Sequence, residues 1–558
     1  MCRSPPTKEA TTSLWAGPSA HGRGIKADVR RRRPWYVSDW TDGWNAKTTA
    51  SLFYMFFTSI APAITFADLL DSATKGKIGV VEVCLSSCVS GVIFSVFAGQ
   101  PLVIVGVTGP VMILTITIYQ LAEALDVNFL YFYSWAQIFA GAMHMLVAVL
   151  GWCDFIRYIT NFSCHTFGLL IATIYAWTGI RSIYHYYTRS GPFDVALLQT
   201  IIALGCTLVA SWLAKSRRWT IFNERVRVFI GDYAPTMSIV VWTAISKVGR
   251  AGHLGSKLPR VNVPRNFGTT SGRPWVLAFY SLESWAVVLA LVPALIILVL
   301  FVFDHNVSSI MAQSKEFKLQ KGSAYHLDFF VLGICIVVTG VLGIPPCNGL
   351  IPQAPLHTKS LGVLRTERLP DGRVVEVVEK TWEQRYTNFG QAVLTGVVLI
   401  RPLITVLGTI PNAALHGLFI FMALESLPGN ELWERVCLLV SEPRLRRSDR
   451  AWYSLDFPVI ARFTRLQFAL AVVIFFVTEV PVIGMTFPLF IAALVFVRTK
   501  YLPKKYDARI LELIDPLIDL APIDKTPSTA DLLEEGTPPS SPAPQVVSSP
   551  VRNRAGSA

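Results

Sequence analysis

The sequence has few charged residues for its length. Only 16% of its 558 residues are Asp, Glu, Lys or Arg, whereas a soluble domain carries about 25%. Its 9 cysteines are scattered, and no pair has the spacing of a zinc site or of a disulfide framework. Its Gly-x-Gly sequences lack the strand–helix context of a nucleotide-binding loop. We therefore predict a protein that is not an enzyme and that binds no metal and no cofactor.

The sequence contains several long runs without charged residues. Hydrophobic residues make up 52% of the chain, and the clearest uncharged runs lie at residues 51–67, 285–303 and 468–477. A helix needs roughly 20 mostly apolar residues to cross a bilayer. The sequence predicts an all-α polytopic membrane protein.

The net charge of +13 follows the predicted spans. Basic residues cluster beside them, at residues 30–33, 215–218, 444–447 and 498–505. This pattern is typical of the positive-inside rule and of contact with anionic lipid. It indicates a bilayer as the partner and gives no reason to expect nucleic acid.

Three regions follow from composition. We expect a disordered basic cytosolic tail over residues 1–46, a transmembrane domain over 47–501 and a Pro/Ser-rich cytosolic tail over 502–558. An even number of spans places both termini in the cytosol, and an amphipathic segment at 429–450 is expected to lie on that face. The fourteen expected segments are 49–71, 78–98, 110–124, 128–151, 165–188, 195–214, 225–246, 281–313, 328–344, 353–364, 387–400, 403–424, 465–482 and 484–498.

Two of these spans are interrupted by glycine and proline. AGQPLVIVGVTGPVMIL (residues 98–114) precedes the third element of the first half, and GIPPCNGLIPQAP (residues 343–355) precedes the third of the second half, which is the tenth overall. Ordinary proline kinks would explain one break alone. Breaks at matching positions favour a transporter of two inverted repeats of seven segments, at about 47–247 and 275–501.

Each break predicts a half-helix that starts inside the membrane. Its first N–H groups lack intrahelical partners and carry partial positive charge, which makes an anion site. Pro110, after Thr108 and Gly109, fits the first turn of the third helix. Gln353 follows a proline at the start of the tenth, and Asn348 lies in the preceding turn. We predict that these four polar or glycine residues contact substrate.

Asp304 is a charge in the eighth span. The next charged residue is Lys315, which at 1.5 Å per residue places Asp304 about 16 Å from it, near the middle of a ~30 Å core. The alternative is that Asp304 marks a helix end. An intramembrane carboxylate indicates function, so Asp304 is a candidate for substrate contact and for a proton or coupling ion. His357 and Lys359 are possible partners, but we expect Lys359 to point to the cytosolic mouth. Asp68 is expected to mark the membrane interface.

Several motifs resemble the bicarbonate and borate transporter family. They are APAITFADLL (61–70), FAGQPLVIVGVTGP (97–110), FDHNVSSIMAQ (303–313), IPPCNGLIPQAPLHTKSL (344–361) and LHGLFIFMALESLPGNELWER (415–435). The resemblance implies a core domain (spans 1–4 and 8–11) that carries the site. It also implies a gate domain (spans 5–7 and 12–14) that forms a homodimer, and an elevator-like motion of the core. It is closest to the borate branch of plants and fungi.

The sequence departs from the chloride/bicarbonate exchangers of that family at one informative position. They have an arginine near the position of Gln353, whose amide, like the Asp304 carboxylate, can hydrogen-bond the hydroxyls of borate. The 46 residues before the first span are also too few for the large cytosolic domain of the animal exchangers. We therefore expect a secondary transporter that exports borate or boric acid across the plasma membrane, or alternatively the vacuolar membrane. The alternatives are an exchanger of bicarbonate or another anion, and a non-transporting sensor or scaffold.

Overall fold

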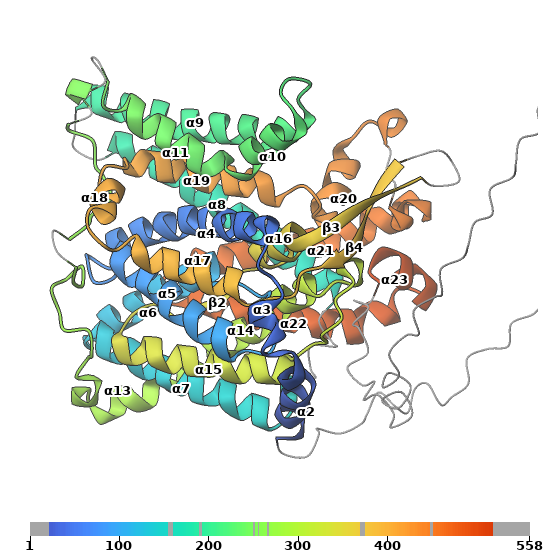
Figure 1. The fold of residues 1–558 in the computed structure, drawn as a ribbon, viewed down its shortest axis with the longest axis horizontal. Helices are drawn as coiled ribbons and strands as arrows, with labels where there is room; N and C mark the ends of the chain where they lie inside the picture. The colour runs from blue at the N-terminus through green and yellow to red at the C-terminus, as the bar shows by residue number, and fades with distance from the viewer. Residues whose placement is uncertain are drawn as a thin grey trace, which may run out of the picture. The chain divides into compact units, whose positions relative to one another are not determined.

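The computed structural model describes residues 22–153, 160–188, 192–248, 252–254, 256–264, 267–368, 374–446 and 450–516, and this part is mostly helical (Figure 1). The main helices of the first half are α4 (Ala46–Ala73), α5 (Val80–Phe97), α6 (Gly109–Ala124), α7 (Phe129–Val149), α8 (Asn161–Thr188), α9 (Phe193–Ala214), α10 (Glu224–Asp232) and α11 (Ala234–Ile245). Those of the second half are α13 (Ser284–Leu289), α14 (Leu291–Ala312), α15 (Tyr325–Leu342), α16 (Gln353–Leu361), α17 (Tyr386–Val397), α18 (Leu403–Leu407), α19 (Asn412–Ser426), α20 (Glu431–Val440), α21 (Phe457–Thr478) and α22 (Phe487–Phe496).

Within these described ranges, nine helices are long and apolar enough to cross a membrane, or ten if the bent pair α10 and α11 forms one span. Each of the fourteen expected segments contains a helix. The helices α6, α16, α17 and α19 have 16, 9, 12 and 15 residues, so they fall short of a full crossing. A polytopic helical membrane protein is confirmed, while fourteen crossings stay a prediction.

The helices pack in two groups. Helices α4, α5, α7, α14, α15, α16 and α17 pack against one another, and α8 packs with α9, α19 and α21, with α11 against α9. Helix α19 also contacts α4, so the groups meet along this pair. In Figure 1, α9, α11 and α19 lie above α4, α17, α5 and α15.

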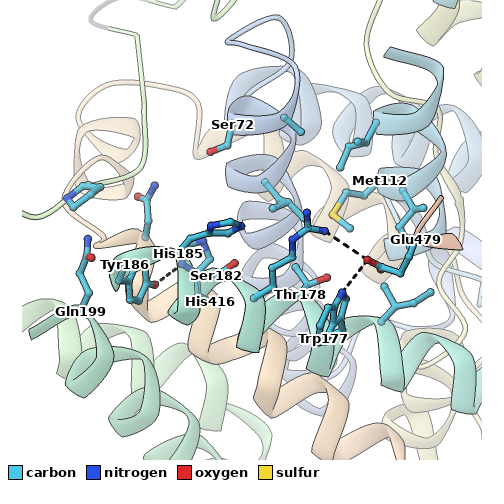
Figure 2. A pocket seen from close by; sticks show the side chains of 18 of the residues that line it. Ser72, Met112, Trp177, Thr178, Ser182, His185, Tyr186, Gln199, His416 and Glu479 are labelled. Atoms are coloured by element: carbon cyan, nitrogen blue, oxygen red, sulfur yellow. Dashed lines mark hydrogen bonds and ion pairs between the residues drawn. The ribbon is translucent and has the colours of Figure 1, made fainter. Parts of the chain in front are cut away.

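A cavity of about 700 Å³ lies where the two groups meet. Leu69 of α4 and Met112 of α6 line one side, and Thr178 of α8 and His416 of α19 line the other. Figure 2 shows its polar wall, where the Trp177 indole N–H donates to Glu479 at 2.9 Å. This cavity reaches toward the first helix break.

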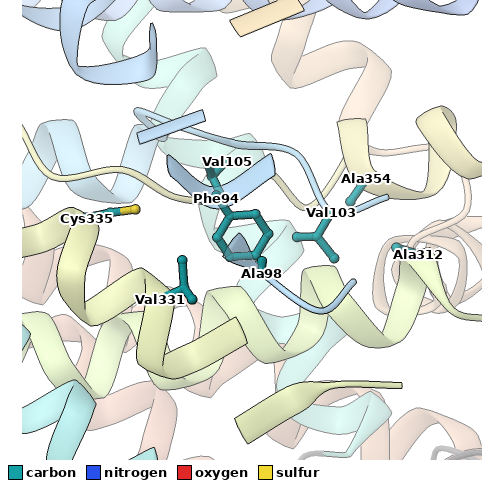
Figure 3. Packing of buried hydrophobic residues seen from close by; sticks show 8 residues of the cluster. All are labelled: Phe94, Ala98, Val103, Val105, Ala312, Val331, Cys335 and Ala354. Atoms are coloured by element: carbon teal, nitrogen blue, oxygen red, sulfur yellow. The ribbon is translucent and has the colours of Figure 1, made fainter. Parts of the chain in front are cut away.

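The interior beneath the breaks is close-packed and apolar. Figure 3 shows a cluster that joins the end of α5, the first break and helices α14, α15 and α16. Phe94 is fully buried at its centre, with Val103 and Val105 of the first break and Ala354 of α16 around it. Removing this apolar surface from water or lipid contact holds the two breaks against one packed core.

Residues 22–45 differ from the predicted disordered tail. They form α2 (Arg23–Arg32), a 3-10 turn η2 (Arg33–Trp35) and α3 (Ser38–Thr41). The buried Asp39 carboxylate lies 3.0 Å from Arg32, 2.8 Å from Lys321 and 3.2 Å from Arg385. The prediction was wrong here because basic residues taken as solvated are paired inside the protein, where ionic groups need partners.

Other boundaries also differ. Strands β3 (Gly362–Arg368) and β4 (Val374–Thr381) form an antiparallel hairpin where an all-α fold was expected; the β-branched run VVEVVEK favours strand. Helix α21 (Phe457–Thr478) starts eight residues before the expected span, because the helix includes the exposed Arg462 and Arg465. In the predicted C-terminal tail, helix α23 (Ala508–Ile514) is folded, and the Phe162 N–H donates to Asp515 at 2.7 Å. The Pro/Ser-rich segment lies outside the described residues.

Candidate functional site

The two helix breaks meet in the middle of the protein. Strand β1 (Val105–Gly106), in the first break, pairs antiparallel with strand β2 (Asn348–Gly349), in the second, so that Gly106 lies opposite Asn348. The Leu350 N–H also donates to the Ile104 carbonyl at 2.8 Å. These bonds satisfy backbone groups that the breaks leave without helical partners. The half-helices α6 and α16 therefore begin from one crossing point.

The start of α6 is built by three residues that the sequence analysis predicted. Thr108 is the N-cap, and its side chain accepts from the Val111 N–H at 3.4 Å while its carbonyl accepts from Met112 at 2.9 Å. Pro110 has no N–H and fits the first turn. Of the first-turn N–H groups that we expected to be available to an anion, only that of Gly109 is not used within α6. The helix dipole adds its partial positive charge.

The start of α16 has a different construction. Pro352 is the N-cap and no side chain caps the helix. Pro355 removes another first-turn donor, and the Ala354 N–H donates to Leu350 at 3.0 Å. The Gln353 amide nitrogen donates to the Thr58 carbonyl of α4 at 3.4 Å. Gln353 is half-buried and holds its position by this one long contact.

Asp304 lies against the second break. It is 1% exposed, in α14, and the side chain of the buried Asn348 lies beside it at a geometry that falls short of a hydrogen bond. The close packing needs a glycine at 349, because a Cβ there would lie 2.9 Å from the Ser308 Cβ. The predicted residues Asp304 and Asn348 are therefore brought together, with Ser308 one turn along α14.

Several buried polar atoms at this place have no hydrogen-bond partner among the described residues. They are Asp304 Oδ1, Ser308 Oγ, Asn348 Nδ2 and Gln353 Oε1. A buried polar group without a partner costs free energy, so such groups are rare in folded proteins. Donors and acceptors that gather at the meeting point of two helix N-termini form a site with capacity for a polar anion.

Tyr175 of α8 lies at the start of α6, and the sequence analysis did not single it out. A Cβ built at Gly109 would lie 2.3 Å from the Tyr175 hydroxyl oxygen, so only glycine allows this contact. The hydroxyl is also within electrostatic range of Asp304. No local pattern in IATIYAWTGI marks this tyrosine, because the contact joins helices distant in the sequence.

The structure differs from two expectations, for His357 and Asp68, and agrees with the preferred one for Lys359. His357 does not pair with Asp304, because its Nδ1 contacts the Leu102 carbonyl at 2.8 Å and its Nε2 the Thr387 hydroxyl at 2.7 Å. Lys359 is exposed. Asp68 was expected at the interface, but it is 5% exposed and lies 3.6 Å from His416 Nε2, because α4 packs against α19 there.

The fold is shared with membrane proteins of solved structure. The structure is similar to the transmembrane domain of a cyanobacterium bicarbonate transporter, BicA (TM-score 0.51, 15% identity, 77% of this chain and 98% of that one). It is also similar to murine Solute Carrier 26 family member A9, an anion transporter, in the inward-facing state (TM-score 0.53, 13% identity, 90% and 77%).

Sequence comparison defines the family. The HCO3- transporter integral membrane domain matches residues 20–193 and 187–519, and the chain belongs to this family. It is 37% identical to Boron transporter 1 of Saccharomyces cerevisiae over 434 residues, which are 76% of this chain and 73% of that protein. It is 33% identical to Probable boron transporter 3 of Arabidopsis thaliana, over 88% of this chain and 80% of that one. Anion exchange protein 3 of Rattus norvegicus is 27% identical, over 88% of this chain and 42% of that protein.

Proposed function

We propose that this protein is a secondary transporter that exports borate or boric acid across the plasma membrane. The observation that carries this proposal is a buried carboxylate, Asp304, beside the second helix break, where that break pairs with the first one. Neither break contains an Arg or Lys (residues 98–114 and 343–355). A site of this kind attracts an anion by the helix dipoles but has a carboxylate that only a hydrogen-bond donor can approach.

Borate, B(OH)4−, combines the negative charge and the hydrogen-bond donors that this site can bind. Its negative charge suits the starts of α6 and α16, and its hydroxyl groups can donate to Asp304 and to the Gln353 oxygen. Chloride has charge but no donor, so the carboxylate repels it. The relatives named as boron transporters in yeast and in Arabidopsis support this choice.

Transport would follow an elevator-like cycle of two repeats, at about 47–247 and 275–501. The helix group that contains α4 and α14 would be the mobile core, and the group that contains α8 and α19 would be the gate and the homodimer contact. The antiparallel pairing of β1 with β2 supports inverted repeats, because it joins corresponding positions of the two halves. With both termini cytosolic, the cavity of Figure 2 would face the outside.

A bicarbonate exchanger is the second candidate, and the family description favours it. Bicarbonate carries one hydroxyl group, so it can satisfy Asp304 less fully than borate. A non-transporting sensor would bind the same anion without moving it.

Flux in proteoliposomes separates these functions. The full-length protein is reconstituted, and the uptake of boron, chloride and bicarbonate is measured against protein-free vesicles. We expect saturable boron flux and little chloride flux. Chloride/bicarbonate exchange without boron flux would show the second candidate, and saturable binding without counterflow would show a sensor.

A further inference from the structure

Three aromatic rings meet beside the start of α6. Phe66 comes from α4, Tyr175 from α8 and Phe419 from α19, and each pair of ring centroids is 6.0 Å apart. Phe66 and Phe419 are buried. The cluster therefore joins one helix of the first packing group to two helices of the second.

This aromatic cluster lies next to the cavity. The cavity is lined by Leu69, Thr178 and His416, each three residues from the cluster member on its own helix. Met112 lines it too, three residues beyond Gly109. Since 3.6 residues make one helical turn of 5.4 Å, each ring and Gly109 lie about one turn along the helix from one of these lining residues.

The Tyr175 hydroxyl has a position that packing alone does not require. A phenylalanine ring would fill the same space between Phe66 and Phe419. The added oxygen instead lies against Gly109, at the positive end of α6, and within electrostatic range of Asp304. It is thus near both groups that the proposed function assigns to the anion, the backbone at the start of α6 and the Asp304 carboxylate.

We propose that Tyr175 is a specificity-determining residue of the transport site, whose hydroxyl hydrogen-bonds the hydroxylated anion held between Gly109 and Asp304. This inference rests on the proposed function. A tyrosine hydroxyl can donate to one borate oxygen and accept from a B–OH group, whereas chloride can only receive a hydrogen bond. Tyr175 therefore favours a substrate that both donates and accepts.

The test is the kinetics of boron uptake by the full-length protein in proteoliposomes. Tyr175→Phe removes one oxygen and keeps the ring. Tyr184→Phe is the matched control, because Tyr184 is on the same helix and 64% exposed. Phe419→Leu loosens the same cluster but leaves the hydroxyl in place. Initial rates are measured over a range of boric acid concentrations at fixed pH, together with chloride flux.

We expect Tyr175→Phe to raise the KM for boron about tenfold or more, because a hydrogen bond to a charged group is lost. Its maximal rate should stay within about threefold of wild type, since the packing of the three rings remains. The ratio of boron to chloride flux should fall. Phe419→Leu should change the maximal rate more than the KM, and Tyr184→Phe should change neither.

An unchanged KM and flux ratio in Tyr175→Phe, with normal boron flux in wild type, would overturn the role of Tyr175 and leave the proposed function standing. A wild-type protein without boron flux would instead overturn the proposed function, together with the substrate assigned to Tyr175. A variant that misfolds would be recognised by size-exclusion chromatography. If Tyr175→Phe misfolds, Phe419→Leu decides. A KM that rises by the same factor as the maximal rate falls would mean that the cluster acts through its packing only, and would overturn the role of the Tyr175 hydroxyl.

Discussion

The two half-helices begin at one crossing but are built differently. Helix α6 has 16 residues and a threonine cap whose side chain and carbonyl both accept first-turn N–H groups. Helix α16 has 9 residues, starts at a proline without a side-chain cap and places Gln353 at its first position. The first start is fixed by its own hydrogen bonds, whereas the second leaves a polar side chain adaptable.

This difference suggests separate roles in the candidate site for the two breaks. The first break, with Thr108 satisfied and Gly109 pressed against Tyr175, supplies a rigid wall with positive potential. The second break supplies side chains with unused hydrogen-bond capacity, Asn348 and Gln353. We infer that the first break positions the anion and the second one selects it. The following variants test this division.

Asp304→Asn should have the largest effect, because Asp304 is the buried carboxylate beside the second break, where β2 pairs with β1. The change removes the buried charge that accepts from the substrate, and loss of a buried charged hydrogen-bond partner costs up to a factor of about 1,000. The measurement is boron flux in proteoliposomes. Asp126→Asn, at an exposed position, is the control and should behave as wild type. Flux near the wild-type level in Asp304→Asn would remove this residue from the site.

Gly109→Ala should nearly abolish transport by distorting the rigid wall. The new methyl group would lie 2.3 Å from the Tyr175 oxygen, and a displacement of about 1 Å at a reacting or binding site can cost a hundredfold in rate. If the clash also lowers the yield of folded protein, adding Tyr175→Ala to Gly109→Ala should restore part of that yield, because it removes the clashing ring. Gly362→Ala, whose nearest contact would be 3.3 Å, is the matched control. Full flux in Gly109→Ala would contradict the close contact.

Gln353→Arg should shift selectivity without removing transport. A cation at the second break offers chloride and bicarbonate the attraction that the amide lacks, so their flux relative to boron should rise roughly tenfold. Gln353→Glu is the opposite-charge control and should lower the flux of every anion. An unchanged flux ratio in Gln353→Arg would show that selection occurs elsewhere.

Thr108→Val should have the smallest effect on transport and a visible effect on stability. Loss of an N-cap costs about 1 kcal/mol, so the Tm in detergent should fall by a few degrees. Gln353→Ala removes only one contact of 3.4 Å and should leave the Tm unchanged while it raises the KM. The reverse pattern, with Gln353→Ala the less stable of the two, would contradict the division between a fixed and an adaptable break.

The sequence predicted the breaks well because their cause is local. Proline and glycine interrupt hydrogen bonding wherever they fall, so the starts of both half-helices could be placed to within a residue. Asp304 was equally visible, since a charge in an apolar run stands out. The family resemblance then added the expected core and gate domains and the comparison with an arginine at the position of Gln353.

Contacts between distant segments were not predictable. The β1–β2 pairing involves two residues on each side, too few for a strand pattern. Tyr175 is one of 17 tyrosines, and its role depends on α8 packing against the start of α6. The prediction of disorder for residues 22–45 failed for a related reason. Composition shows the charges, but only the fold shows that Arg32 and Asp39 are buried against each other.

Equilibrium binding tests the central claim, that Asp304 and the two helix breaks form one site for a hydroxylated anion. Boric acid is titrated calorimetrically into the purified full-length wild type, Asp304→Asn and Asp126→Asn at one fixed pH. We predict one saturable site per protomer in wild type and in Asp126→Asn, and no measurable site in Asp304→Asn. Equal affinity in all three proteins would contradict the account.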